Sequence, residues 1–459
     1  MTVAPRLVLV ALVGATPLCA QARSQTADAR QTGITVYQDG RVLNRTVFPV
    51  RVPAGRSTHQ LALGSIDPAS LFALDAEVAV VGAQYDPAVA EADAIRRLVG
   101  RPLQFLQFGG RDTTVVTATV LGVDPERYQL ANGRVIFQRP GLPAFPAELA
   151  PPDARLSVAV ASDRARSGLG LGYFTSGASW NASYSLIVNR GSARITGVAA
   201  VTAGTLRADS VDVQLLAGNV GQAAPQPMFR RNALDARVAM AAEAVAVEER
   251  VGEAHLYTLP GRHHFEPGLV TVASLFEPTT APVERVYTIS GQVPFYGGLP
   301  QTGSEDEVPV AVTYVVKRTA RTGFGDTPVP GGTARLYERD SGGRPQLIGE
   351  AAIGHTAAGQ DLRLSAGTAF DLTAERTQSE YQTQRVNNRT VATAAYEVTV
   401  SNAGDSTATV DVLETRGGEW SVVSSSVPAE KLSSTQTRFR VRVPARGEAR
   451  LTYRIRVVW

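Results

Sequence analysis

The chain has 459 residues and one cysteine, Cys19, so it cannot form an internal disulfide. Its 45 Lys and Arg residues nearly balance 42 Asp and Glu residues, and the dispersed charges offer no basic run that would track nucleic-acid phosphates. We therefore expect a protein held together by core burial, without thiol chemistry and without a nucleic-acid partner.

The first 22 residues have the pattern of an export signal. A charged start is followed by an apolar run over 7–18, and Ala20 and Ala22 supply the small side chains that signal peptidases accept. The run is shorter than the roughly 20 residues of a membrane-spanning helix. Leu18 disfavours a lipid on Cys19, because lipoprotein signals place a small residue there. We expect an exported protein, periplasmic, envelope-associated or secreted, with no transmembrane helix in the mature chain.

Apolar and polar residues alternate along nearly the whole chain, which predicts an all-β fold made of several β-sandwiches. Strands are expected first at Ile34–Tyr37 and Val42–Val52. Asn132-Gly133, between Tyr128–Ala131 and Arg134–Phe137, predicts a hairpin with a type I′ turn. One short helix is expected at Ala92–Gly100.

Composition divides the mature chain into three expected domains. An N-terminal β domain covers 30–140, and the proline-rich stretch Gly141–Pro152 is the expected linker. A central β domain covers 153–365, and an Ig-like C-terminal β-sandwich covers 366–459. Trp180 and Trp420 are expected to fill the cores of the last two domains.

One segment, 221–253, departs from the alternation. It is rich in Ala, Glu and Val, and Leu234, Val238, Ala241 and Val245 recur at near-helical spacing. This predicts a mobile insertion with a short helix near 232–251 and makes it a candidate place for a partner to bind.

Several strips resemble the bacterial DUF4139 family, a domain of unknown function whose relatives include proteins named mucoidy inhibitor A. They occur in the family's order over most of the mature chain: Ile34–Gly40 with Val52–Gly55, Tyr173–Trp180 with Tyr184, Leu215–Val220, His255–Pro260, Gly332–Asp340, Phe370–Arg376, Val443–Gly447 and Leu451–Trp459. The resemblance implies an exported β protein and no particular activity. This chain lacks the coiled coil of the mucoidy inhibitor relatives, so a partner held through that coiled coil is not carried over.

The histidines give the best candidate for a metal site. His264 and Glu266 would share one face of a strand next to His263, and His355 would have to join them, because catalytic zinc needs three protein ligands. A polar loop is the favoured interpretation of the pair, and His255 has the features of a strand-edge or core histidine with one hydrogen bond. We assign no metal ligand.

Other candidate chemistry is equally sparse. The acidic cluster Glu305-Asp306-Glu307 lacks the spacing of a calcium loop, and Ser424–Ser426 lacks the Gly-x-Ser-x-Gly setting of a hydrolase nucleophile. We assign no catalytic residue and no cofactor. The expectation is a non-enzymatic envelope protein that binds a protein or a polysaccharide. The alternatives are a periplasmic hydrolase of an envelope polymer and an outer-membrane β-barrel, the latter suggested by the alternating final strand Leu451–Trp459.

Overall fold

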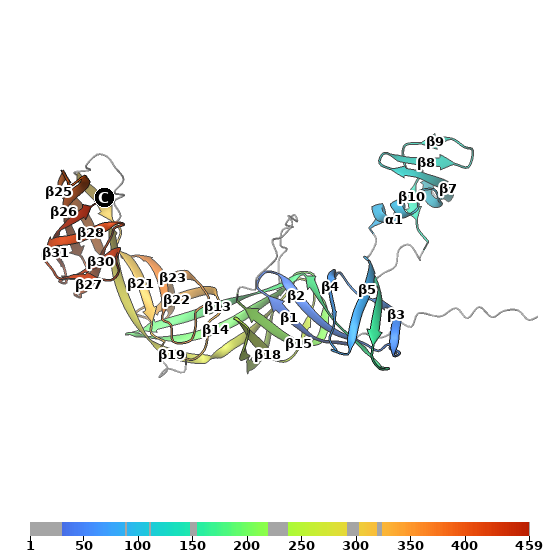
Figure 1. Ribbon diagram of the computed structural model, residues 1–459, viewed down its shortest axis with the longest axis horizontal. Coiled ribbons are helices and arrows are strands. Elements are labelled where there is room, and N and C mark those ends of the chain that lie inside the picture. Colours follow the sequence, from blue (N-terminus) through green and yellow to red (C-terminus); the bar gives the residue numbers. More distant parts are fainter. Residues whose placement is uncertain are drawn as a thin grey trace, which may run out of the picture. The chain divides into compact units, whose positions relative to one another are not determined.

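The computed structural model describes residues 30–87, 90–109, 112–146, 154–218, 237–291, 303–318 and 324–458. The described chain is almost entirely β, which confirms the predicted fold class (Figure 1). It divides into two compact units: unit 1 centres on Thr46–Tyr173, and unit 2 comprises Gln31–Arg45 with Phe174–Trp459. The three domain boundaries expected from composition stay predictions.

Unit 1 contains two small cores. The first lies beneath β11 (Arg155–Ser162), which pairs antiparallel with β3 (Gly55–Ala62) and β5 (Val78–Asp86), and beneath the pair β4 (Asp67–Ala73) and β12 (Leu169–Ser176). In β11 every second residue is buried, as the alternating sequence predicts.

The second core of unit 1 is a five-stranded sheet, in the order β10-β6-β7-β8-β9, packed on the helix α1 (Glu91–Arg97). Its strands are β6 (Pro102–Gly109), β7 (Asp112–Val123), β8 (Glu126–Leu130), β9 (Val135–Ile136) and β10 (Leu142–Ala144). The helix confirms the expectation at Ala92–Gly100.

The hairpin predicted at Asn132-Gly133 is present, because β8 pairs with β9. The type of turn differs from the prediction. Gly133 has φ +80°, but Asn132 has no positive φ, whereas a type I′ turn needs both. The amide of Leu130 bonds to the carbonyl of Arg134, so the loop has three residues with glycine in the left-handed position.

Unit 2 begins with strands in the order β17-β18-β15-β1-β2. They are β1 (Arg30–Tyr37), β2 (Arg41–Phe48), β15 (Ala208–Ala217), β17 (Val247–Val251) and β18 (Ala254–Phe265). Next to them is an eleven-stranded sheet whose central path runs β23-β22-β13-β14-β19-β27-β30-β29. Its strands are β13 (Ala178–Asn189), β14 (Ser192–Ala203), β16 (Arg237–Val245), β19 (Leu269–Gly291), β21 (Ala311–Val316), β22 (Gly332–Arg339), β23 (Pro345–Ile353), β24 (Leu362–Thr368), β27 (Ala408–Thr415), β29 (Ala429–Lys431) and β30 (Gln436–Val443).

The last sheet follows the order β20-β25-β26-β31-β28 and packs on β27 and β30 to make a C-terminal sandwich. Its strands are β20 (Gly303–Val308), β25 (Leu372–Val386), β26 (Arg389–Asn402), β28 (Glu419–Ser425) and β31 (Gly447–Val458). β19 pairs with β14 near its start and with β27 at its end, so one strand passes from the central core into the sandwich core.

The helix expected near 232–251 is wrong over 237–251. Arg237–Val245 forms β16, parallel to β19, and Val247–Val251 forms β17, antiparallel to β18. Gly252, at φ +62°, starts the two-residue turn between β17 and β18. The edges of β18 and β19 offer hydrogen-bond partners to the backbone of these two segments. A helix with so thin an apolar stripe would bury little surface, so strand pairing is the more stable choice. The rest of the expected insertion that precedes β16, 221–236, lies outside the described residues.

The two tryptophans differ. Trp180 is fully buried in the central core, as expected, and its indole N–H donates to the carbonyl of Leu216 at 3.2 Å. Trp420 does not fill the centre of the C-terminal sandwich: it is only partly buried, and its indole N–H donates to the carbonyl of Ser434. The reason is that Trp420 lies on β28, the edge strand of its sheet.

Candidate ligand-binding site

Unit 2 contains a cavity of about 350 Å³. It lies where β19, β21, β22, β23 and β24 meet the loop from β24 to β25 and the loop from β26 to β27. This volume lies in the usual range of small-ligand sites. The lining combines aromatic, charged and very small side chains: Arg285, Tyr287, Val312, Tyr314, Glu338, Ile348, Ala366, Ala369, Phe370, Asp371, Leu372, Asn402, Gly404, Asp405, Ser406 and Ala408.

Strand register produces one wall of this cavity. Arg285 and Tyr287 are two residues apart on β19, so their side chains share a face. β21 pairs with β19 such that Tyr314 lies opposite Arg285 and Val312 lies opposite Tyr287. The Arg285 guanidinium therefore lies over the Tyr314 ring, with its carbon 5.4 Å from the ring centroid.

Arg285 is engaged by its own neighbours. One guanidinium nitrogen donates to the Tyr287 hydroxyl at 3.4 Å, and another approaches both carboxylate oxygens of Glu338 at 3.4 Å. Burial by itself lowers the pKa of Arg285. The hydrogen bond to Tyr287 and the nearby Tyr314 and Glu338 outweigh it, so the pKa lies above its ordinary value. Burial raises the pKa of Tyr314, which therefore stays a neutral phenol.

The loop between β24 and β25 supplies the rim of the cavity. Its backbone is fixed on both sides of Phe370: the amide of Ala369 donates to the carbonyl of Val310 at 2.8 Å, and the amide of Ala403 donates to the carbonyl of Asp371 at 2.8 Å. The Phe370 side chain is nevertheless 96% exposed. A well-anchored backbone thus presents an uncovered aromatic ring at the mouth of a cavity.

The loop between β26 and β27 closes the opposite side. The side-chain amide of Asn402 donates to the carbonyls of Ser406 and Pro444 and accepts a bond from the amide of Gly404, so this buried side chain holds its own loop in shape. Asp405 forms an ion pair with Arg446 at 2.5 Å. For the Asp371 carboxylate, no hydrogen-bond or ion-pair partner exists within the described ranges.

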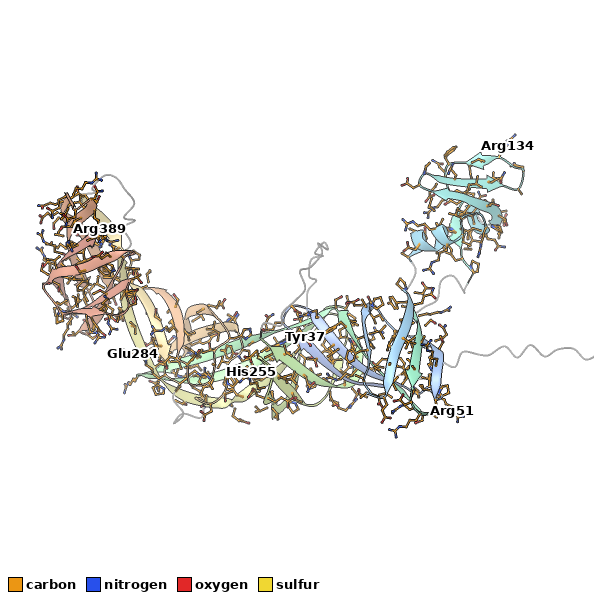
Figure 2. All side chains as sticks on the ribbon, in the orientation of Figure 1. Tyr37, Arg51, Arg134, His255, Glu284 and Arg389 are labelled. Carbon is orange, nitrogen blue, oxygen red and sulfur yellow. The ribbon has the colours of Figure 1, made fainter. Side chains whose placement is uncertain are left out.

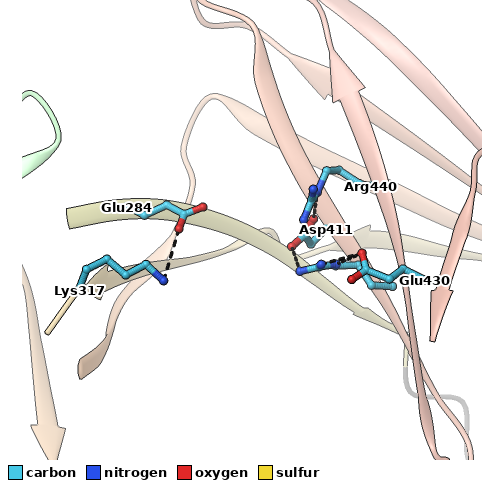
Figure 3. A network of polar contacts seen from close by, with 6 residues as sticks. Glu284, Lys317, Asp411, Glu430 and Arg440 are labelled. Atoms are coloured by element: carbon cyan, nitrogen blue, oxygen red, sulfur yellow. Dashed lines mark hydrogen bonds and ion pairs between the residues drawn. The ribbon is translucent and has the colours of Figure 1, made fainter. Parts of the chain in front are cut away.

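Two further charged clusters in unit 2 are structural. In Figure 3, Glu284 of β19 pairs with Lys317 at 3.8 Å, and Asp411 of β27 accepts from Arg440 at 3.3 Å. Arg438 joins Asp411 to Glu430 on β29. These pairs cross-link neighbouring strands on partly exposed surfaces, where each contributes at most about 1 kcal/mol.

Inside the C-terminal sandwich, Glu414 lies between two arginines. It is 3.1 Å from Arg376 and 2.5 Å from Arg416, and all three side chains are buried. Tyr453 donates to the same carboxylate at 2.7 Å. This cluster is closed within the core and does not line the cavity.

The histidines considered as metal ligands are distributed over separate contacts. His264 contacts Asp209 at 2.7 Å and Glu266 at 3.3 Å, whereas His263 bonds to the carbonyl of Pro260. His355 instead accepts a bond from the amide of Gly331. Within the described ranges, no group of three or more His, Cys, Asp or Glu side chains is arranged to hold a metal ion.

The remaining sequence candidates have structural contacts. His255, marked in Figure 2, pairs with Glu248 at 2.7 Å across the β17–β18 hairpin. Ser425 donates to the carbonyl of Val427, and Ser426 accepts from the amide of Thr452. Glu305-Asp306-Glu307 lie in β20, but their side chains are outside the described part of the structure.

Sequence reasoning did not identify the cavity residues. Phe370 and Asp371 occur in a strip quoted for the DUF4139 resemblance, but nothing in their spacing links them to Arg285 or Tyr314. The available signal was local: Phe370-Asp371 interrupts the alternation just before β25, and a large aromatic in a connecting segment is a reason to suspect a binding role.

No helix in the described ranges is long and apolar enough to cross a membrane. No family model and no curated protein matches this chain.

Proposed function

We propose that this protein is an exported, non-catalytic binding protein of the bacterial cell envelope, and that its ligand enters the cavity beside Phe370. Export rests on the signal-like pattern of residues 1–22, and the envelope setting rests on the resemblance to the DUF4139 family. The partner is a protein or a polysaccharide of the envelope.

The observation that carries the proposal is the 96% exposure of Phe370 at the mouth of a cavity of about 350 Å³. Exposing an aromatic ring forgoes the stabilisation that its burial would bring, roughly 1.5–3 kcal/mol. The anchored backbone around the ring reduces the entropy that a ligand would have to remove on binding. Aromatic residues beside a concave surface are frequent centres of binding energy.

Photo-crosslinking in the native envelope tests this proposal. A photoreactive phenylalanine analogue at position 370 of the full chain is expected to form discrete adducts. The same analogue at Leu347, a 57% exposed residue of unit 2 outside the cavity lining, is the matched control. Adducts specific to position 370 support the proposal. Equal adducts at both positions, or none at 370, overturn it.

A turnover assay separates binding from hydrolysis. Purified mature protein is incubated with peptidoglycan and with envelope polysaccharides, and we expect no released product. Release of product that disappears in Asp371→Asn would replace the binding proposal with a hydrolase acting on an envelope polymer.

A further inference from the structure

We infer that the cavity beside Phe370 recognises a cationic group, a guanidinium or an ammonium, as carried by a basic side chain of a peptide. The inference rests on the proposed binding function and adds the chemistry of the ligand. It follows from which polar atoms of the lining are already used and which remain for a ligand.

The side-chain N–H donors of the lining, those of Asn402 and Arg285, are engaged by neighbouring groups. The Asn402 amide donates twice within its own loop. The Arg285 guanidinium donates to Tyr287 and contacts Glu338 while lying over Tyr314. The Tyr287 hydroxyl keeps its proton as a donor, because it accepts rather than donates in its contact with Arg285.

Acceptors, in contrast, remain available. The Asp371 carboxylate has no partner within the described ranges, and Glu338 is held only by long contacts of 3.4 Å. The charged lining residues are one cation, Arg285, and three carboxylates, those of Glu338, Asp371 and Asp405. Asp405 is partly neutralised by Arg446. The cavity is therefore acidic, although the chain as a whole carries a formal charge of +3.

Phe370 adds an aromatic face to the same lining that holds the Asp371 carboxylate. A cation over an aromatic ring is attracted by the ring quadrupole, and the adjacent carboxylate reinforces that attraction. A guanidinium suits both contacts, because its plane stacks on a ring while its edge donates to a carboxylate.

Other ligand classes fit this inventory poorly. An anionic group would face three carboxylates and find only an engaged arginine. Sugar hydroxyls are uncharged, so the excess of carboxylates in the lining favours them less than it favours a cation. An ammonium or a guanidinium donates only, and its charge is complementary to the Asp371 carboxylate.

Fluorescence anisotropy on the mature full-length protein tests the inference. The probe is a labelled alanine pentapeptide with blocked ends and a central arginine. Its control is the same peptide with citrulline, which keeps the shape of arginine without the charge. We expect citrulline to weaken binding about tenfold, a central glutamate to abolish it, and added salt to weaken the arginine peptide. Equal binding of the arginine and citrulline peptides would overturn the inference.

Protein variants locate the site of binding. Asp371→Asn is expected to weaken binding of the arginine peptide about threefold to tenfold, and Phe370→Ala by a similar factor. Asp326→Asn removes the same charge from an exposed position outside the cavity and is expected to change nothing. Unchanged melting temperatures show that the variants fold. If Asp371→Asn and Asp326→Asn behave alike, the cation does not bind in this cavity and the inference fails.

Two arms complete the design. The first compares the affinity of methylguanidinium with that of the arginine peptide. Equal affinities assign the site to a free cation, whereas a higher affinity of the peptide assigns it to a basic segment of a polypeptide chain. Specific crosslinks at position 370 without any preference for charge would leave the proposed binding function standing and reject the cation.

Discussion

Arg376 and Glu414 form an ion pair of 3.1 Å in the core of the C-terminal sandwich, where their side chains are 2% and 0% exposed. The carboxylate also contacts Arg416 at 2.5 Å and accepts the hydroxyl proton of Tyr453. One anion thus compensates two buried cations. Tyr396 assists by placing its ring 4.1 Å from the Arg376 guanidinium carbon. The Arg376 charge is retained despite burial, because Tyr453 and Glu414 hold its pKa above the ordinary value.

Removing that anion is expected to be severe. Glu414→Gln leaves two buried guanidiniums without a counter-charge, so the sandwich should lose about 3–5 kcal/mol of stability. Hydrogen exchange of the β26 and β27 amides in the full chain measures this loss locally. Glu430→Gln, which removes a 55% exposed partner of Arg438, is the control and should change stability by less than about 1 kcal/mol. Similar losses in both variants would show that the buried cluster is not essential.

A second expectation concerns alkaline pH. Burial raises the pKa of Tyr184, Tyr257 and Tyr453 above the ordinary value of 10.0. Tyr184 and Tyr257 also donate their hydroxyl protons to the carbonyls of Pro330 and Pro328, and these bonds require the neutral phenol. Above pH 10 the unfolded chain loses protons that the folded chain keeps. Stability is therefore complete below pH about 10 and falls as pH rises beyond it.

Tyrosinate absorbance and circular dichroism recorded together check this. The buried phenols are expected to ionise only as β-structure is lost. Tyr184→Phe should be less stable at neutral pH, because Pro330 loses its donor, and should show a shallower decline above pH about 10. Full ionisation of all tyrosines near pH 10 with the fold intact would contradict the expectation.

The sequence sufficed to predict individual strands, because burial in a sheet imposes a two-residue period that β11 and β26 display throughout. It failed where a partner strand decides the structure, as in β16, whose Ala/Val-rich stretch also suits a helix. The cavity could not be predicted from the sequence for the same reason. Arg285 of β19 contacts Glu338 of β22, 53 residues later in the chain, and no local pattern in the sequence indicates that these two strands approach each other.

The two tryptophans provide a direct comparison. Trp180 is fully buried, so Trp180→Ala should destabilise the central core of unit 2 by about 3–5 kcal/mol. Trp420 is only partly buried on an edge strand, and Trp420→Ala should destabilise the sandwich by clearly less, about 1–2 kcal/mol. Hydrogen exchange of β13 and of β31 reports the two losses separately. A larger loss of stability in Trp420→Ala than in Trp180→Ala would contradict this expectation and show that Trp420 is a main core residue of the sandwich.

The last expectation concerns mildly acidic pH. Burial, and to a smaller extent the charge of His255, lower the pKa of His355 below the ordinary value of 6.5. The ring accepts the amide proton of Gly331 on Nδ1 at 3.0 Å, which requires that nitrogen to be unprotonated. Protonation therefore favours the unfolded chain. The stability contributed by His355 is complete above pH about 6.5 and is lost as pH falls through the lowered value.

His355→Asn isolates this contribution, because its side-chain oxygen can accept the same amide proton but does not titrate in this range. The wild-type melting temperature should fall between pH 7 and pH 5, and His355→Asn should show a smaller fall over that interval. His264→Asn makes the same replacement at a 52% exposed histidine outside this hydrogen bond and is the comparison variant. If the slope of His355→Asn equals that of the wild type, another group is responsible for the acid sensitivity, and the bond from Gly331 is not the acid-sensitive element.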